Sequence, residues 1–326
     1  MKYHIDTQSW SYLFKGWLIT DCALRNEEFL ALCLRKTVSA DEASAIWDSD
    51  IPTRLVFIKL KDHASNNWGD TTFDQGFDLP VLGVSRLPFS HPQGMLASKN
   101  LDGDVWARGS NLDGPLEQIH KGGEPFPKRL KCINGITYCV SAFRRIYKRI
   151  AIGQWVPMQK GFPSTKRDLN QGFNDLDAFS ESDMYAVGGN GDIWHYDGKQ
   201  WSQMGFPSNV ELGTVTCAGD GNVYISGEGG SLWVGQKSTW KSIYKGSSSI
   251  LWNDALWFEN KLWLSSDYQF RTWNGKDLEP VTHEGKDVPM TGHMDAYDGL
   301  LAIASSEYVM TYDGTNWKTI VAPYLD

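Results

Sequence analysis

The sequence predicts an all-β fold built from repeated four-stranded units, and three observations support this prediction. The 326 residues include 15 Trp, 13 Tyr, 14 Phe and 32 Gly, a combination that favours short strands joined by tight turns. Hydrophobic residues make up 41% and charged residues 21%, which excludes the composition of a disordered chain. A short phrase also recurs along most of the chain. The length fits one large all-β unit or two ordinary domains.

The repeat is clearest in two copies of one phrase. Residues 196–201 read Tyr-Asp-Gly-Lys-Gln-Trp, and residues 312–317 read Tyr-Asp-Gly-Thr-Asn-Trp. The equivalent large apolar residues lie at Leu116, Trp155, Trp201, Trp240, Leu278 and Trp317, with spacings of 39, 46, 39, 38 and 39. An insertion at residues 163–172 accounts for the long interval. Residues 80–320 therefore contain six repeats of about 39 residues.

Each repeat is expected to form a four-stranded meander. In residues 176–204, four apolar runs are separated by turns that contain Asn-Gly and Asp-Gly, which supply the positive φ values of tight hairpins. A period near 40 residues with four strands per unit is typical of a β-propeller blade.

The first 75 residues do not carry the repeat but contain strand candidates at 17–22, 29–35 and 54–61. Ser39 and Glu42 form a capping box for a short helix that extends up to Trp47. Residues 1–75 are therefore predicted as an atypical first blade with a helical insertion. Together with six repeats it makes a single propeller domain over residues 1–326 with about seven blades; six or eight remain open.

The Tyr-Asp-Gly-x-x-Trp phrases resemble those of bacterial members of the β-propeller superfamily. The resemblance covers residues 80–320 and implies the fold but no activity, because propellers include enzymes, receptors and scaffolds. The chain lacks the Gly-His and Trp-Asp dipeptides of typical WD40 blades. The paired glycines that kelch blades repeat do not recur in every blade, although pairs occur at residues such as 188–189 and 229–230.

No catalytic or metal-binding motif is recognisable. The seven histidines show no HxH or HExxH spacing, and neither a phosphate-binding loop nor a GxSxG nucleophile motif occurs. The five cysteines are odd in number and have no CxxC spacing, which predicts buried free thiols. We therefore expect no catalytic residues, no metal and no cofactor.

Three aspartates are followed by Ala at the expected start of an inner strand: Asp177, Asp254 and Asp295. If they occupy matching places in their blades, they converge on the channel and bind a cation or act in glycoside hydrolysis. The favoured alternative is that each caps a turn of its own blade. Trp252 and His293 complete the channel-mouth candidates.

Basic residues are concentrated in one region. Residues 121–167 contain eleven basic residues against one acid, a net charge of +10, whereas the whole chain carries −8 and the remainder therefore −18. This segregation predicts a basic docking surface for an acidic partner or for phosphate groups; two solvated faces without a partner are the alternative. The partner-binding candidates are Lys128, Arg129, Arg144, Arg145, Lys148, Arg149, Lys166 and Arg167.

These features favour a non-catalytic propeller that binds another protein. The specific hypothesis is a bacterial immunity protein that neutralises a cognate toxin; the alternative is a carbohydrate-active enzyme or lectin that uses channel carboxylates and Trp residues. Because no secretion signal or apolar membrane segment is apparent, we expect a cytoplasmic protein without membrane contact. Nucleic acid is an unlikely partner at a pI of 5.4. The partner, the contacted face and the oligomeric state stay open.

Overall fold

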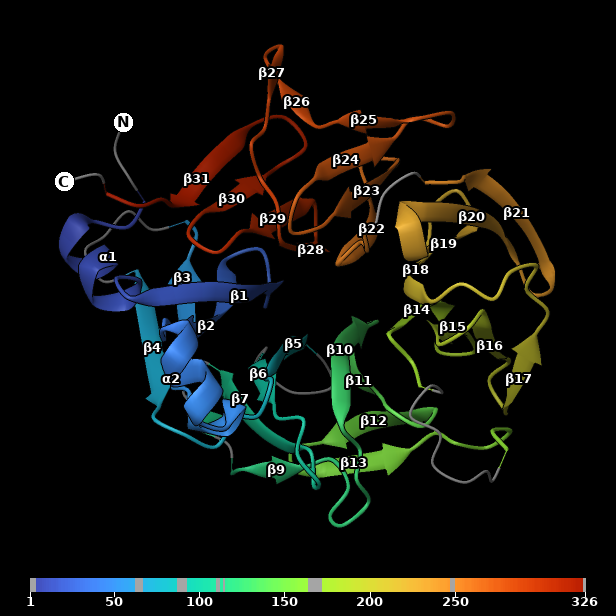
Figure 1. The fold of residues 1–326 in the computed structure, drawn as a ribbon, viewed down its shortest axis with the longest axis horizontal. Coiled ribbons are helices and arrows are strands. Elements are labelled where there is room, and N and C mark those ends of the chain that lie inside the picture. The colour runs from blue at the N-terminus through green and yellow to red at the C-terminus, as the bar shows by residue number, and fades with distance from the viewer. Residues whose placement is uncertain are drawn as a thin grey trace.

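The computed structural model is a ring of seven antiparallel sheets, which confirms the predicted single seven-bladed propeller (Figure 1). It describes residues 4–61, 67–86, 93–109, 112–113, 115–163, 172–246 and 250–324. The predicted insertion at residues 163–172 lies almost entirely outside this part. Within each blade the strands follow one another in sequence order, as tight turns between short apolar strands require.

We number the blades in chain order. Blade 1 contains β1 (Trp17–Leu24), β2 (Phe29–Lys36), β3 (Thr53–Lys59) and β4 (Trp68–Phe73). Blade 2 contains β5 (Val81–Ser85), β6 (Gln93–Ala97), β7 (Asp104–Gly109) and a broken outer strand, β8 (Leu112–Asp113) and β9 (Glu117–Gln118). Blade 3 contains β10 (Pro127–Ile133), β11 (Ile136–Ser141), β12 (Arg145–Ala151) and β13 (Gln154–Pro157). Blade 4 contains β14 (Asp175–Ser180), β15 (Asp183–Gly188), β16 (Asp192–Tyr196) and β17 (Trp201–Met204).

The remaining blades follow the same plan. Blade 5 contains β18 (Leu212–Cys217), β19 (Val223–Gly227), β20 (Ser231–Gln236) and β21 (Thr239–Tyr244). Blade 6 contains β22 (Asp254–Phe258), β23 (Lys261–Ser265), β24 (Phe270–Trp273) and β25 (Leu278–Pro280). Blade 7 contains β28 (His293–Tyr297), β29 (Leu300–Ala304), β30 (Val309–Tyr312) and β31 (Trp317–Val321). A small hairpin, β26 (Thr282–His283) and β27 (Lys286–Asp287), projects between blades 6 and 7 (Figure 1).

The Tyr-Asp-Gly-x-x-Trp phrase is the hairpin between the third and fourth strands of a blade. In blade 4, Tyr196 pairs with Trp201, and the Asp197 carboxylate accepts hydrogen bonds from the backbone N–H groups of Lys199 and Gln200 at 2.8 and 2.9 Å. Gly198 has a φ of +86°, which glycine adopts without strain. Blade 7 repeats this geometry, with its Tyr and Trp rings stacked at 4.8 Å.

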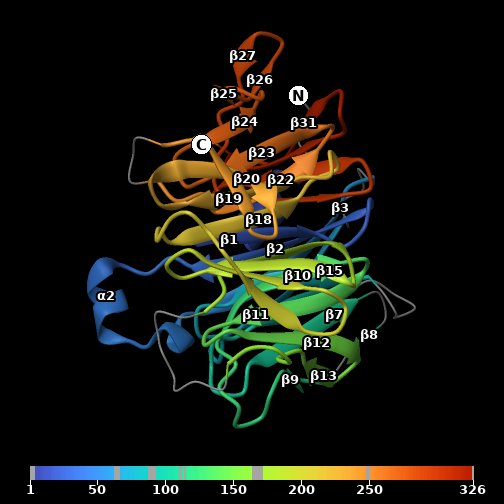
Figure 2. The same ribbon diagram turned by 90° about the vertical axis from the view of Figure 1, so that its right-hand side faces the viewer.

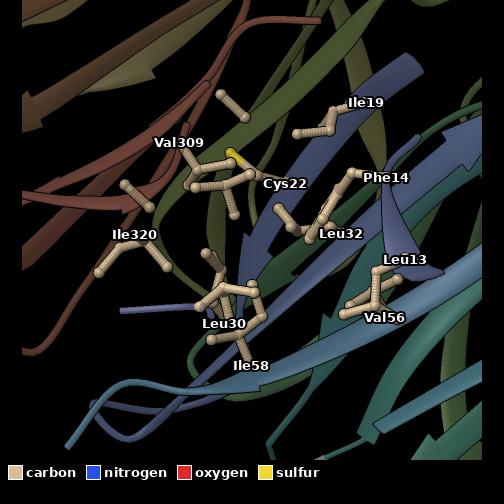
Figure 3. Packing of buried hydrophobic residues seen from close by; sticks show 14 of the residues in the cluster. Leu13, Phe14, Ile19, Cys22, Leu30, Leu32, Val56, Ile58, Val309 and Ile320 are labelled. Carbon is tan, nitrogen blue, oxygen red and sulfur yellow. The ribbon is translucent and has the colours of Figure 1, made fainter. Parts of the chain in front are cut away.

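The ring closes between blades 1 and 7 without a shared strand. Each of these blades takes all four of its strands from one end of the chain, so the seam is held by packing between the two sheets and by bonds such as Ile19 N–H to Ser306 O at 2.8 Å. Figure 3 shows Val309 and Ile320 of blade 7 against side chains of blade 1 such as Cys22 and Leu30. Burial of this apolar surface stabilises the closed ring at about 25 cal/mol per Å².

Blade 1 carries two short helices, one before β1 and one between β2 and β3. The predicted capping box is present: helix α2 (Ala40–Ala45) begins after Ser39, whose hydroxyl accepts from Glu42 N–H while the Glu42 carboxylate accepts from Ser39 N–H. A short 3-10 turn, η1 (Asp48–Asp50), follows it, and a second one, η2 (Glu228–Gly230), precedes β20. Helix α1 (Thr7–Leu13) was not predicted from the sequence.

In the described ranges no helix has the length and apolarity needed to span a membrane.

Strand order gives the propeller two distinct faces. The first strands of neighbouring blades contact one another around the channel, so the first strand of each blade is innermost. Because successive strands are antiparallel, the connections into the first strand and those between the second and third strands share one face, which we call the upper face. The other connections form the lower face. Helix α2, between β2 and β3, therefore stands on the upper face and projects from it in Figure 2.

Candidate functional site

The centre of the ring holds a cavity of about 470 Å³ lined by all seven inner strands. Its lining includes four carboxylates and several cations, so charged groups from different blades meet there. Three channel-mouth candidates, Asp177, Asp254 and Asp295, line it together with His293. Trp252 does not: it is 4% exposed, packs between blades 5 and 6, and donates its indole N–H to Gly230 O at 3.1 Å. Its predicted place at the channel mouth is wrong.

The three predicted aspartates tie each blade to the next one. Asp177 accepts from Cys217 N–H of blade 5 at 2.8 Å, Asp254 from Met294 N–H of blade 7 at 3.0 Å, and Asp295 from Leu24 N–H of blade 1 at 2.8 Å. The expectation that each caps only a turn of its own blade is therefore wrong, although Asp295 also accepts from the neighbouring Ala296 N–H at 2.9 Å. These carboxylates satisfy backbone donors that the inner strands leave unpaired on their channel side.

The three positions are also not equivalent. Asp254 pairs with Ser265 at the end of β22 and β23 that lies farthest from their hairpin turn, whereas Asp295 pairs with Ala302, two residues nearer the hairpin turn of β28 and β29. A two-residue shift keeps the side chain on the same side of a strand but changes its level in the channel. The shared Asp-Ala dipeptide therefore does not mark a matching place in the blade, contrary to the sequence expectation.

Two further aspartates also accept a hydrogen bond from the backbone of the next blade, and neither was identified from the sequence. Asp175 accepts from Val215 N–H at 3.0 Å, and Asp21 from Leu82 N–H at 3.3 Å. Asp175 stands two residues before Asp177, and this Asp-x-Asp alternation on one face of a strand is a signal that the sequence does contain. Asp21 lies in the non-repeating first blade, so no internal alignment points to it.

Arg129 crosses the channel from blade 3 to blade 6. Its guanidinium donates to Asp254 Oδ1 at 2.7 Å and to Asn253 O at 2.6 Å, and its Nε lies 3.5 Å from Asp175 Oδ1. His293 Nδ1 lies 3.0 Å from the other Asp254 oxygen. One carboxylate thus joins groups from three blades, and charge-assisted bonds of this kind are stronger than neutral ones.

This cluster shifts the pKa values of its members in opposite directions. Burial opposes the charge of Asp254, but Arg129 and His293 outweigh burial and hold the pKa of Asp254 well below its usual range. Burial likewise opposes the charge of His293, but the Asp254 hydrogen bond and the Asp21 charge raise the pKa of His293 to about 9. Burial raises the pKa of Asp21 to about 6. Burial also raises the pKa values of Asp177 and Asp295 above the usual range of an aspartate. His293 is therefore a cation at neutral pH.

Several basic residues of blade 3 form ion pairs with carboxylates of other blades. Arg144 forms a bidentate pair with Asp192 of blade 4, at 2.6 and 3.0 Å. Arg149 pairs with Glu117 of blade 2, and both side chains are 0% exposed. Together with Arg129 in the channel, these two arginines are bound within the protein, so the prediction that they form part of a basic docking surface is wrong.

The other basic candidates are more accessible. Arg145 donates to the backbone carbonyls of Gly123 and Glu124, and Lys148 pairs with Glu181. Lys128 is exposed and reaches Asn174 Oδ1 at 3.0 Å. Lys166 and Arg167 lie outside the described residues. A role of any of them in partner binding stays a prediction.

The described residues contain no group of three or more His, Cys, Asp or Glu side chains arranged to hold a metal ion. The five cysteines are free thiols; Cys22, Cys33 and Cys139 are buried, as the sequence predicted, whereas Cys132 and Cys217 are only partly buried. The cavity thus combines paired charges with backbone-bound carboxylates, an arrangement suited to holding the blades together.

Comparison with known proteins identifies the chain's relatives. The immune protein Tsi7 of Pseudomonas aeruginosa is 31% identical over 249 residues, which cover 74% of this chain and 81% of Tsi7. The chain belongs to the Tsi7 family. No protein-family model matches the sequence.

The fold of this Tsi7-family chain is shared with structures of distant sequence. The WD40 β-propeller domain of Doa1 superposes with a TM-score of 0.59 at 14% identity, over 90% of this chain and 95% of that domain. The designed protein Ika8 gives 0.54 at 14% identity, over 95% of this chain and 98% of its own. PorZ of Porphyromonas gingivalis gives 0.57 at 10% identity, over 96% of this chain and 39% of its own. These likenesses concern the fold alone.

Proposed function

We propose that this chain is an immunity protein that binds a protein toxin and neutralises it without catalysis. The observation that carries the proposal is membership of the Tsi7 family, whose curated member is described as an immune protein. The proposal includes a cytoplasmic location, which fractionation of cells and detection of the chain would test. It also includes the narrower assignment to bacterial propellers with Tyr-Asp-Gly-x-x-Trp blades, which the matching hairpins of blades 4 and 7 support.

The contents of the channel support binding over catalysis. General acid–base chemistry needs carboxylates that are free to exchange protons with a substrate. Here Asp177 and Asp295 hold backbone N–H groups of the next blade, and Asp254 is held by Arg129 and His293. The glycan alternative also relied on Trp252 at the channel mouth, where the residue does not lie.

Co-expression with a toxin tests the proposal. Each toxin candidate encoded beside the gene of this chain is expressed in a sensitive host, alone, with this chain, or with an unrelated seven-bladed propeller as control. We expect this chain to restore growth against one candidate and the control propeller to restore none. Failure of the chain against every candidate would overturn the proposal.

Stoichiometry separates binding from catalysis. Purified chain is titrated into a fixed amount of the toxin identified by co-expression, and residual toxin activity is followed. A binding protein abolishes activity only when it equals the toxin in amount, whereas an enzyme that modifies the toxin acts at a small fraction of that amount. Complete inhibition far below equivalence would show that the chain is an enzyme.

A further inference from the structure

Exposed apolar side chains are gathered on one face of the propeller. The described residues include twelve large apolar side chains that are exposed, and eight of these lie in or beside connections of the upper face. The eight are Leu18, Ile46, Trp47, Leu79, Leu101, Leu251, Tyr268 and Tyr308. Of the other four, Tyr12 stacks on Trp68 at the lower end of β4, and Leu116, Ile150 and Phe179 lie at a sheet edge or toward the lower face. Single exposed apolar residues are ordinary on a protein surface, and among these side chains only Ile46 and Trp47 are adjacent in the chain.

Trp47 is the most exposed of these side chains, at 81%. It lies in the insertion between β2 and β3, residues 37–52, which carries α2 outward from the upper face (Figure 2). Ile46 beside it is also exposed. Trp is among the residue types that contribute most to protein–protein binding when a partner buries it.

The base of this insertion is fixed to the rest of the propeller. Arg35 pairs with the Asp48 carboxylate at 2.8 Å and donates to Phe77 O at 2.9 Å. The next connection, before β5, is joined to the insertion by Gly76 N–H, which donates to Ser49 O at 2.8 Å. Trp47 N–H itself donates to Asp50 Oδ2 at 3.1 Å. A backbone held in this way binds with a smaller entropic cost than a mobile loop.

The insertion carries only negative charge. Residues 37–52 contain Asp41, Glu42, Asp48 and Asp50 and no Lys or Arg. Asp41, Glu42 and Asp50 are exposed in the same insertion as Trp47, whereas the Asp48 carboxylate is paired with Arg35. An apolar anchor with an acidic rim complements a positively charged protein surface that offers an apolar pocket.

We propose that the insertion at residues 37–52 is the docking element for a basic patch on the toxin, with Trp47 as its buried anchor. This inference rests on the proposed function and adds the contact site and the charge of the partner surface. The acids accelerate the encounter, and Trp47 determines how long the complex persists.

Replacement of the anchor is the decisive test. The probe is a catalytically inactive variant of the toxin identified by co-expression, and binding to the purified full-length chain is measured by calorimetry. Trp47→Ala is expected to weaken binding by roughly 30-fold or more. The matched control is Tyr268→Ala, which removes a 79% exposed aromatic ring on the same face of blade 6 and is expected to change binding by less than about 3-fold. Because both side chains are exposed, both variants should melt like the wild type.

A charge-reversal variant tests whether the acidic residues of the insertion accelerate association with a basic patch. Asp41→Lys is expected to slow association with the same probe several-fold at low salt, with the effect diminishing as salt screens the charges. Asp277→Lys, which reverses an exposed acid on the lower face, serves as its control.

The outcomes separate the two proposals. If the wild type neutralises the toxin and Trp47→Ala binds as well as it does, the docking site is wrong and the proposed function stands. If Trp47→Ala weakens binding but Asp41→Lys accelerates association, the anchor stands and the basic partner surface is wrong. If the wild type neutralises no toxin, both proposals fall.

Discussion

Two charged regions of this propeller differ in what their charges do. Blade 3 and its flanking connections carry most of a +10 run, yet Arg129, Arg144 and Arg149 are paired with carboxylates of three other blades. The insertion of blade 1, which contains Trp47, carries fewer charges, and most of them face solvent. A dense run of charge in a sequence therefore does not identify a binding surface, because the fold can use those charges to hold its own sheets together.

The largest effect should come from breaking the buried pair of blade 3. Arg149→Ala leaves Glu117 charged and buried, so we expect a loss of about 3 to 5 kcal/mol in the free energy of unfolding. Urea denaturation measures it. Lys148→Ala, which breaks the more exposed pair with Glu181, should cost less than about 1 kcal/mol. Equal losses in the two variants would contradict the division between internal and surface cations.

A smaller effect should appear as a dependence of stability on pH. The folded-state pKa of His293 is about 9 and its ordinary value is 6.5, so its stabilisation is fully present below pH 6.5 and is lost as pH rises through 9. Because 33% of the side chain is exposed, we expect about 1 to 2 kcal/mol.

Comparison with a variant isolates this contribution. The difference in unfolding free energy between wild type and His293→Gln should shrink between pH 6 and pH 9.5, as measured by denaturation at each pH. A constant difference across this range would show that folding does not raise the pKa of His293.

The smallest change in stability is expected at exposed lysines of the upper face. Lys121, Lys128 and Lys160 are exposed there, and Lys→Glu at all three should alter the unfolding free energy by less than about 0.5 kcal/mol per site. The direction in which these substitutions change the association rate distinguishes the two proposed docking surfaces. Association with a positively charged toxin surface should become faster at low salt, whereas the basic docking surface predicted from the sequence requires slower association. Stopped-flow measurement of the association rate decides between them.

The repeat made the propeller fold predictable. Blade 1 lacks the repeat and was predicted from its strand-like apolar segments. Three of its strands and its capping box were predicted near their observed positions, because these features depend on local residue order. The pairing of Arg129 with Asp254 spans 125 residues, and no local pattern indicates it. Trp252 was misplaced for a related reason: it lies just before β22, and proximity in sequence to Asp254 does not place its ring on the channel side.

Trp47 shows the opposite limitation. The sequence predicted the helix that ends beside it, but exposure depends on whether neighbouring connections cover the ring. The anchoring of its loop through Arg35 and the connection before β5 becomes visible only in three dimensions.

The seam between blades 1 and 7 has a consequence for how this chain can be rearranged. Both ends of the described chain meet there, where the Tyr324 hydroxyl donates to Ile5 O at 2.5 Å, and neither end contributes a strand to the other's sheet. The seven sheets are thus arranged in a circle whose starting point is arbitrary. A circular permutant, with a short linker across this seam and new ends in an upper-face connection between two blades, keeps the four strands of every sheet consecutive. The closed ring therefore does not require that the blade made first by the ribosome be blade 1.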